Sequence, residues 1–237
     1  EKKPDLLHGL IAMRKMHIRA IAESGLTAAD EMLYPENWSY LSDILSYVAI
    51  GARSVENQQH RLTVSGIDVP AGMKNPTSGD FSVMLNSVIA GQSRHQFIYR
   101  TWSVETSGNP LTHTILRGAV NKHGNAIPNY HYEDLQLLLE KYSEIDVQNP
   151  ATIIDANHSN SNKQYEQQIR IVKEVLHSRQ VSPDISRLVK GVMIESYLEP
   201  GAQKIGCANH VYGKSITDPC LGWAESEKLV YTIADMC

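Results

Sequence analysis

The sequence predicts an α/β fold with a parallel sheet, of the (β/α)8 TIM-barrel class, with about six of the eight βα units present in this chain. Two observations predict it. Short apolar runs alternate with stretches of helical periodicity along the 237 residues, and this alternation favours a parallel sheet. The stretch 47–75 shows one complete unit, in which an apolar run ends in Arg53, a helix-length segment follows, and a second apolar run ends in Lys74. Parallel strands need such crossovers.

The first half of the chain gives a regular series of elements. Residues 4–24 are predicted to form a helix, because Leu7, Ile11 and Ile18 recur at helical spacing and Gly25 ends the run. A turn at 76–80 is expected from its Pro, Ser and Gly residues. The other expected elements are strands at 26–32, 47–53 and 69–74, and helices at 35–45, 55–64 and 81–90.

The second half is less regular, because loops rich in small polar residues interrupt the alternation. The expected elements are strands at 96–101, 113–117, 152–157 and 189–194, helices at 132–142, 163–178 and 224–234, and loops at 103–110, 121–129 and 212–223. We find no linker and expect a single domain over residues 1–237. Two further units, roughly 60 residues at about 30 per βαβ step, are expected to precede Glu1.

Composition excludes several classes of partner. The net charge of −4 gives no general electrostatic case for nucleic acid or an anionic membrane. No apolar run approaches the roughly 18 residues needed to span a bilayer. The three cysteines, Cys207, Cys220 and Cys237, are too few and too scattered for a disulfide framework, which favours a reducing compartment. We therefore expect a cytoplasmic protein that acts on small molecules.

Charged side chains gather where the predicted strands end. These residues are Glu31, Arg53, Lys74, Arg117, His158 and Glu195, each after a different strand, with Asp218 in the loop after the last one. The carboxyl ends of the strands are where closed parallel barrels carry their chemistry. All seven side chains are therefore expected on one face of the sheet.

Arg53, Lys74 and Arg117 form a cationic set. Three inward-facing cations repel one another unless an anion lies among them, and a guanidinium group matches two oxygens of a phosphate or carboxylate. Any one of the three could instead pair with a carboxylate of the protein. The three together favour an anionic ligand.

His158, Glu195 and Asp218 form a second, mixed set. One imidazole and two carboxylates suit a divalent metal ion such as Mn, Fe, Co or Zn. A lone histidine after a strand is usually a hydrogen-bonded structural residue, and the spacing shows no short metal motif, so this hypothesis depends on the predicted fold. His60 lies in a predicted helix, yet its place soon after Arg53 keeps it as a candidate.

Seven motifs in the chain resemble those of the type I 3-deoxy-7-phosphoheptulonate synthases (DAHP synthase, phospho-2-dehydro-3-deoxyheptonate aldolase). The motifs are Gly51-Ala52-Arg53-Ser54, Gly72-Met73-Lys74-Asn75-Pro76-Thr77-Ser78-Gly79, Thr106-Ser107-Gly108-Asn109-Pro110, Ile115-Leu116-Arg117-Gly118, Ile154-Asp155-Ala156-Asn157-His158-Ser159-Asn160, Met193-Ile194-Glu195-Ser196 and Gly213-Lys214-Ser215-Ile216-Thr217-Asp218-Pro219-Cys220-Leu221-Gly222-Trp223. They occur in the family's order, and the resemblance runs nearly end to end.

The resemblance implies a metal-dependent transferase of the shikimate pathway, which leads to chorismate and the aromatic amino acids. Such enzymes condense phosphoenolpyruvate with D-erythrose 4-phosphate to 3-deoxy-D-arabino-heptulosonate 7-phosphate plus phosphate. The implied substrate-binding residues are Glu31, Arg53, His60, Lys74 and Arg117, the implied metal ligands His158, Glu195 and Asp218, and the implied catalytic residues Lys74, His158 and Asp218. A homo-oligomer is expected. Lys74 could donate or shuttle a proton, since an amine held among arginines should have a lowered pKa.

The resemblance also shows a departure. The family's first two strands, with a cysteine metal ligand and a Lys-Pro-Arg-Thr stretch that grips the sugar phosphate, have no counterpart in these residues. The chain is therefore expected to be amino-terminally truncated, and these residues alone are expected to form an open, poorly active barrel. One alternative is a truncated, non-catalytic relative that acts through partner binding or oligomerisation. Another is the related sugar-acid synthase that uses arabinose 5-phosphate, against which the runs 106–109 and 219–223 argue.

Overall fold

A six-stranded parallel sheet forms the centre of the computed structural model, which describes residues 5–237. In spatial order its strands are β1 (Ala28–Glu31), β2 (Leu45–Ile50), β3 (Ala71–Lys74), β6 (Thr112–Leu116), β9 (Thr152–Asp155) and β10 (Val189–Met193). Each strand pairs in parallel with the next. Spatial order therefore follows chain order, as it does along part of a (β/α)8 barrel. Closure into an eight-stranded barrel stays a prediction.

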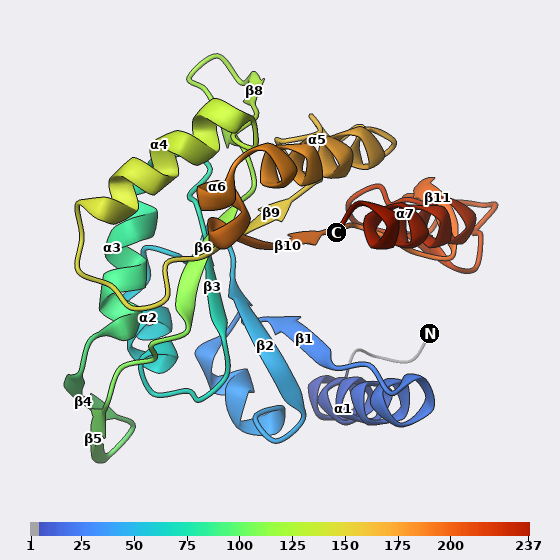
Figure 1. Cartoon of the computed structure of the whole chain (residues 1–237). Coiled ribbons are helices and arrows are strands. Elements are labelled where there is room, and N and C mark those ends of the chain that lie inside the picture. The colour runs from blue at the N-terminus through green and yellow to red at the C-terminus, as the bar shows by residue number, and fades with distance from the viewer. Residues whose placement is uncertain (1–4) are drawn as a thin grey trace.

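Helices follow the strands and lie on the outside of an arc of strands, with α1 at one end and α7 at the other (Figure 1). They are α1 (Leu6–Ser24), α2 (Gln58–Val64), α3 (Phe81–Gln92), α4 (Tyr132–Ser143), α5 (Gln167–Val181), α6 (Pro183–Leu188) and α7 (Trp223–Met236). Side-chain caps begin several of them. Asn57 accepts hydrogen bonds at the start of α2, and Asp80 does so at the start of α3. Such caps satisfy backbone N–H groups that a helix leaves unpaired.

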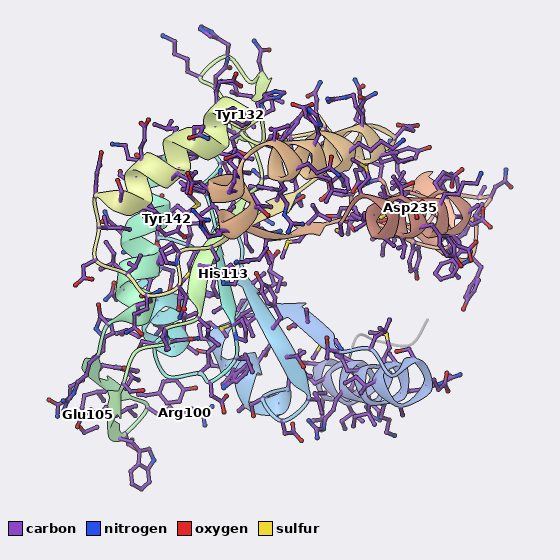
Figure 2. The ribbon with its side chains drawn as sticks, in the orientation of Figure 1. Arg100, Glu105, His113, Tyr132, Tyr142 and Asp235 are labelled. Carbon is purple, nitrogen blue, oxygen red and sulfur yellow. The ribbon has the colours of Figure 1, made fainter. Side chains whose placement is uncertain are left out.

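Two buried clusters hold the sheet against these helices. One gathers side chains of β6, β9 and helices α4 to α6, including Leu116, Ile154 and Leu138. The other lies around β2 and β3 and includes Ile50 and Met73. Tyr142 joins α4 to the sheet (Figure 2), since its hydroxyl lies 2.9 Å from the carbonyl oxygen of Ala151. Because both clusters fix the strands in register, the strand ends are held in defined positions.

Several expected elements were wrong. The helix expected at 35–45 is only a 3-10 helix, η1 (Pro35–Tyr40), because β2 already begins at Leu45. The loop expected at 103–110 contains β5 (Trp102–Thr106), which pairs with β4 (His95–Tyr99) in an antiparallel hairpin. The helix α6 was not expected at all.

Four shorter strands were not expected, and two of them, β8 (Ala126–Ile127) and β12 (Lys214–Ser215), lie in segments expected to be loops. A small hairpin joins β7 (Ala119–Val120) and β8, and β11 (Glu199–Ala202) pairs with β12. Such two-residue pairings carry little sequence signal. Over residues 5–237, no helix is both long enough and apolar enough to cross a membrane.

Candidate active site

A cavity of about 240 Å³ lies where the parallel strands end. Its lining residues are Glu31, Ala52, Arg53, Lys74, Thr77, Arg117, His158, Lys163 and Asp218. Six of the seven charged residues expected at this edge thus face one space. The seventh, Glu195, lines a neighbouring cavity of about 470 Å³ and contacts His158. Strands that run in parallel bring their carboxyl ends together, which is why residues far apart in the sequence meet here.

Lys74 is the buried cation of this cavity. Its Nζ lies 3.2 Å from Glu31 Oε2 and 3.4 Å from Asp155 Oδ2, and its side chain is 9% exposed. Burial acts to lower the pKa of Lys74, but the negative charges of Asp155 and Glu31 outweigh burial and raise it. The expected lowering of the Lys74 pKa was therefore wrong, because carboxylates and not arginines are its nearest charged neighbours.

Arg117 contributes an unsatisfied donor to the cavity. Its Nη1 is buried and has no hydrogen-bond partner among residues 5–237. Burial lowers the pKa of Arg117, against the opposing charges of Asp155, Asp218 and Glu31. Arg53 reaches the same cavity from the loop after β2 and is exposed. A buried donor left without a partner is costly, so this nitrogen favours an incoming acceptor.

His158, Glu195 and Asp218 offer three ligand atoms within 4.8 Å of one another. The Nε2 atom of His158 lies 3.7 Å from Glu195 Oε1 and 3.6 Å from Asp218 Oδ2. Burial raises the pKa of Glu195, and the nearby carboxylates of Asp155 and Asp218 raise it further, against the lowering effect of His158. Crowded carboxylates beside an imidazole fit a divalent cation, which would relieve their repulsion.

Asp155 is a site residue that the sequence reasoning missed. It is 2% exposed, and its Oδ2 lies 2.8 Å from His158 Nδ1 as well as close to Lys74 Nζ. Burial acts to raise the pKa of Asp155, but His158 and Lys74 outweigh burial and lower it. The available signal was an aspartate at the end of an apolar strand, three residues before His158. A carboxylate on Nδ1 leaves Nε2 to face Glu195 and Asp218, an arrangement common in metal-binding histidines.

Lys163 was also missed. Its Nζ lies 3.2 Å from Asp218 Oδ1, at the rim of the same cavity. The loop that carries it has left-handed backbone at three non-glycine residues, with φ of 50° at His158, 52° at Asn162 and 59° at Lys163. Such backbone is unfavourable for residues with a Cβ and is found most often at functional sites.

His60 lies outside the lining of this cavity. It is buried at the start of α2, and its Nε2 lies 3.1 Å from the carbonyl oxygen of Met32 and 3.2 Å from that of Leu33. This contact ties α2 to the segment that follows β1 and Glu31. Substrate binding by His60 stays a prediction.

Comparisons with known proteins agree on one family. Residues 5–231 match a model described as the DAHP synthetase I family. The chain is 38% identical over 217 residues to a Trp-sensitive phospho-2-dehydro-3-deoxyheptonate aldolase of Enterobacter agglomerans, covering 89% of this chain and 60% of that protein. It is 34% identical over 233 residues to the Trp-sensitive enzyme of that name from Escherichia coli (strain K12), covering 96% of this chain and 64% of that protein.

A solved structure shows the same relationship in three dimensions. The phospho-2-dehydro-3-deoxyheptonate aldolase of Francisella tularensis SCHU S4 superimposes with a TM-score of 0.86 at 30% identity, covering 100% of this chain and 67% of that one. The chain spans 60% to 64% of the length of the two curated relatives above.

Proposed function

The chain belongs to the DAHP synthetase I family, and on that premise we propose that it carries the active site of a 3-deoxy-7-phosphoheptulonate synthase. The reaction condenses phosphoenolpyruvate with D-erythrose 4-phosphate and releases phosphate, which opens the shikimate pathway. The relatives named as aldolases of this type support the proposal, and so does the sorting of charge within the cavity.

The observation that carries the proposal is the cationic side of the cavity. Arg53, Lys74 and Arg117 line one space, and Arg117 Nη1 is buried there without a partner among the described residues. Phosphoenolpyruvate brings a phosphate and a carboxylate, which suit two guanidinium groups and an ammonium group. Binding this substrate, with its two anionic groups, would supply the acceptor that Arg117 Nη1 lacks among the described residues.

A second set of side chains, at and beside this cavity, suits a divalent metal ion. His158, Glu195 and Asp218 would hold it. When bound, such an ion supplies Lewis acidity toward a carbonyl oxygen, here the aldehyde of the sugar phosphate. Asp155 Oδ2 lies 2.8 Å from Nδ1 of His158, and this contact would keep Nε2 directed at the two carboxylates.

The remaining steps are bond changes on the two substrates, and the side chains of the cavity act on them. A carbon–carbon bond forms between the methylene carbon of phosphoenolpyruvate and the aldehyde carbon, the aldehyde oxygen takes a proton, water adds at the phosphate-bearing carbon, and phosphate leaves by carbon–oxygen cleavage. Lys74, with its pKa raised by Asp155 and Glu31 against the effect of burial, is protonated at neutral pH. It therefore acts as a cation toward the substrates and not as a base, and its role as proton donor is proposed from its place in the cavity, not from its pKa.

The proposal can be tested by measuring phosphate release by the purified protein. We expect release only when phosphoenolpyruvate, erythrose 4-phosphate and Mn²⁺ are all present. The Lys74→Met variant should lose about 10²- to 10⁴-fold in turnover, the range typical of a positioned acid. The control is Lys190→Met, because Lys190 is exposed and lines a different cavity, at the amino ends of the strands.

Two results would contradict the proposal at different levels. Full turnover in Lys74→Met would remove Lys74 from the mechanism and leave the reaction standing. A folded wild-type protein that releases no phosphate with both substrates and any of Mn²⁺, Fe²⁺, Co²⁺ or Zn²⁺ would instead favour a non-catalytic relative.

A further inference from the structure

Three buried asparagines surround the main chain on either side of Arg117. Asn75 follows β3, Asn129 precedes α4, and Asn160 lies in the loop after β9. Their exposures are 0%, 6% and 5%. We call these three residues the asparagine cluster. Burying a primary amide costs free energy unless its donors and acceptor are paired, so the partners of these amides show what the cluster holds in place.

Asn75 and Asn129 bind the main chain of the strand end that carries Arg117. The Arg117 N–H donates to Asn75 Oδ1 over 2.9 Å, and Asn75 Nδ2 donates to the carbonyl oxygen of Gly118 over 2.9 Å. The Gly118 N–H donates to Asn129 Oδ1 over 2.7 Å. Asn129 Nδ2 donates to Asn75 Oδ1 over 3.1 Å, which joins the two amides. Side chains therefore hold this strand end just past the residues where β6 pairs with its neighbours.

Asn160 extends the cluster to the neighbouring strand β9. Its Nδ2 donates to the carbonyl oxygen of Leu116 over 3.2 Å and to that of Asp155 over 2.8 Å. Its Oδ1 accepts from the Asn129 N–H over 2.9 Å. The cluster thus connects the ends of β3, β6 and β9, which carry Lys74 and Arg117 into the cavity and place Asp155 beside Lys74.

The backbone at this point tolerates little adjustment. Gly118 has a φ of 75°, and a Cβ added there would lie 2.6 Å from the main-chain nitrogen of Asn160. The Arg117 side chain ends in a buried Nη1 without a partner in the described part of the chain. The position of the backbone at Arg117 therefore matters for where the guanidinium group lies, because no acceptor in the described residues holds Nη1.

We infer that the asparagine cluster is a positioning element, which aims the Arg117 guanidinium group at the anionic substrate. The inference rests on the proposed function, in which Arg117 binds phosphoenolpyruvate. Shifting the backbone at Arg117 would misplace its guanidinium group in the cavity, and small misplacements of a binding group cost affinity steeply. The amide side chains themselves are positioning residues and need no contact with substrate.

The test compares substitutions at three buried asparagines of the protein. Asn75→Ala and Asn129→Ala break the cluster. Asn109→Ala is the matched control, because Asn109 is 2% exposed and also binds main chain, at 2.9 Å from Asn109 Nδ2 to Val69 O and 3.0 Å from Leu111 N to Asn109 Oδ1. Its contacts lie just before β3 and β6, at the opposite end of the sheet.

The measurements are phosphoenolpyruvate binding by calorimetry, steady-state constants for both substrates, and urea unfolding of every variant. We expect Asn75→Ala and Asn129→Ala to bind phosphoenolpyruvate about tenfold more weakly, a loss typical of a displaced binding group. The KM for phosphoenolpyruvate should rise in parallel, with the KM for erythrose 4-phosphate unchanged. Asn109→Ala should bind within about twofold of wild type, even if it loses as much stability.

The possible outcomes distinguish a failure of the positioning role from a failure of the proposed function. Affinity losses that follow stability losses equally in all three variants would overturn the positioning role, as would wild-type affinity in Asn129→Ala. In Asn129→Ala the main-chain N–H at position 129 can still donate to Asn160 Oδ1. This variant therefore tests the positioning role even if Asn75→Ala does not fold. A wild-type protein that binds no phosphoenolpyruvate would overturn the proposed function as well.

Discussion

Two buried pairs of ionisable groups, at opposite ends of the central sheet, have pKa values that are shifted in opposite senses. At the carboxyl end, Lys74 and Asp155 lie 3.4 Å apart and their pKa values move toward the charged forms. At the amino end, the hydroxyl of Tyr47 lies 2.7 Å from His113 Nε2, and the pKa values of both move toward the neutral forms. Figure 2 marks His113 among the central strands.

The comparison shows which physical effect decides the charge state. Burial acts in the same sense on all four groups, against the charged form. For His113 the effect of burial is the larger one, because it is opposed only by a hydrogen bond to the Leu111 carbonyl oxygen, 2.8 Å from Nδ1. For Lys74 and Asp155 a nearby opposite charge outweighs burial. Lys74 and Asp155 therefore stay ionised because the fold places a counter-charge beside each of them.

Removing that counter-charge should produce the largest effect. Asp155→Asn leaves Lys74 buried with only Glu31 beside it, and we expect the free energy of unfolding to fall by about 3 kcal/mol, as when one partner of a buried ion pair is lost. Urea unfolding at pH 7 measures the change. The exposed Asp68→Asn should stay within about 0.5 kcal/mol of wild type. Equal stability of Asp155→Asn would mean that burial, not charge pairing, governs both ends of the sheet.

A smaller effect is expected from crowding the amino end. A Cβ on Gly72 would lie 2.1 Å from the Tyr47 hydroxyl and 2.4 Å from Ile115 Cδ1. Gly72→Ala should therefore displace Tyr47 from His113 and destabilise the protein by about 2 kcal/mol, within the range for overpacked cores. Gly191→Ala is the control, since a Cβ there meets nothing within 4 Å. Thermal unfolding of the two variants compares them, and matching midpoints would show that the Tyr47–His113 contact is not needed.

The smallest effect is the pH dependence carried by His113. Burial lowers its pKa below the ordinary value of 6.5, so the unfolded chain binds a proton that the folded protein does not. Its contribution to stability is full above about pH 6.5 and is lost as the pH falls through the lower folded value, with a slope of at most about 1.4 kcal/mol per pH unit. Urea unfolding from pH 7.5 to pH 5 should show this slope in wild type and less of it in His113→Gln.

His123→Gln is the control for that series, because His123 is exposed in the loop between β7 and β8. An unchanged slope in His113→Gln would mean that the imidazole titrates freely and that the amino end is not a neutral environment. Asp155 affects stability in a separate pH range. Because its pKa is lowered in the folded protein, its contribution to stability is lost only as the pH falls below about 3.9.

Local patterns were enough to find the strands and the charges that follow them. Each of the six main strands was expected within a few residues of its position, because a buried parallel strand is a short apolar run bounded by turn residues. Glu31, Lys74 and Arg117 could be assigned to strand ends for the same reason. The β4–β5 hairpin and η1 were missed or misassigned, because cross-strand pairing and short 3-10 turns leave weak local signals.

The sequence by itself determined the order of chemical groups along the chain: cations after β2, β3 and β6, then an imidazole and two carboxylates. Only the tertiary structure decided which charges became neighbours. It placed Asp155 beside Lys74, 81 positions away in the printed sequence, and so reversed the expected shift of the Lys74 pKa. The reason is physical. Which strands end side by side is set by sheet packing, and electrostatic energy depends on distance in space, not on separation along the chain.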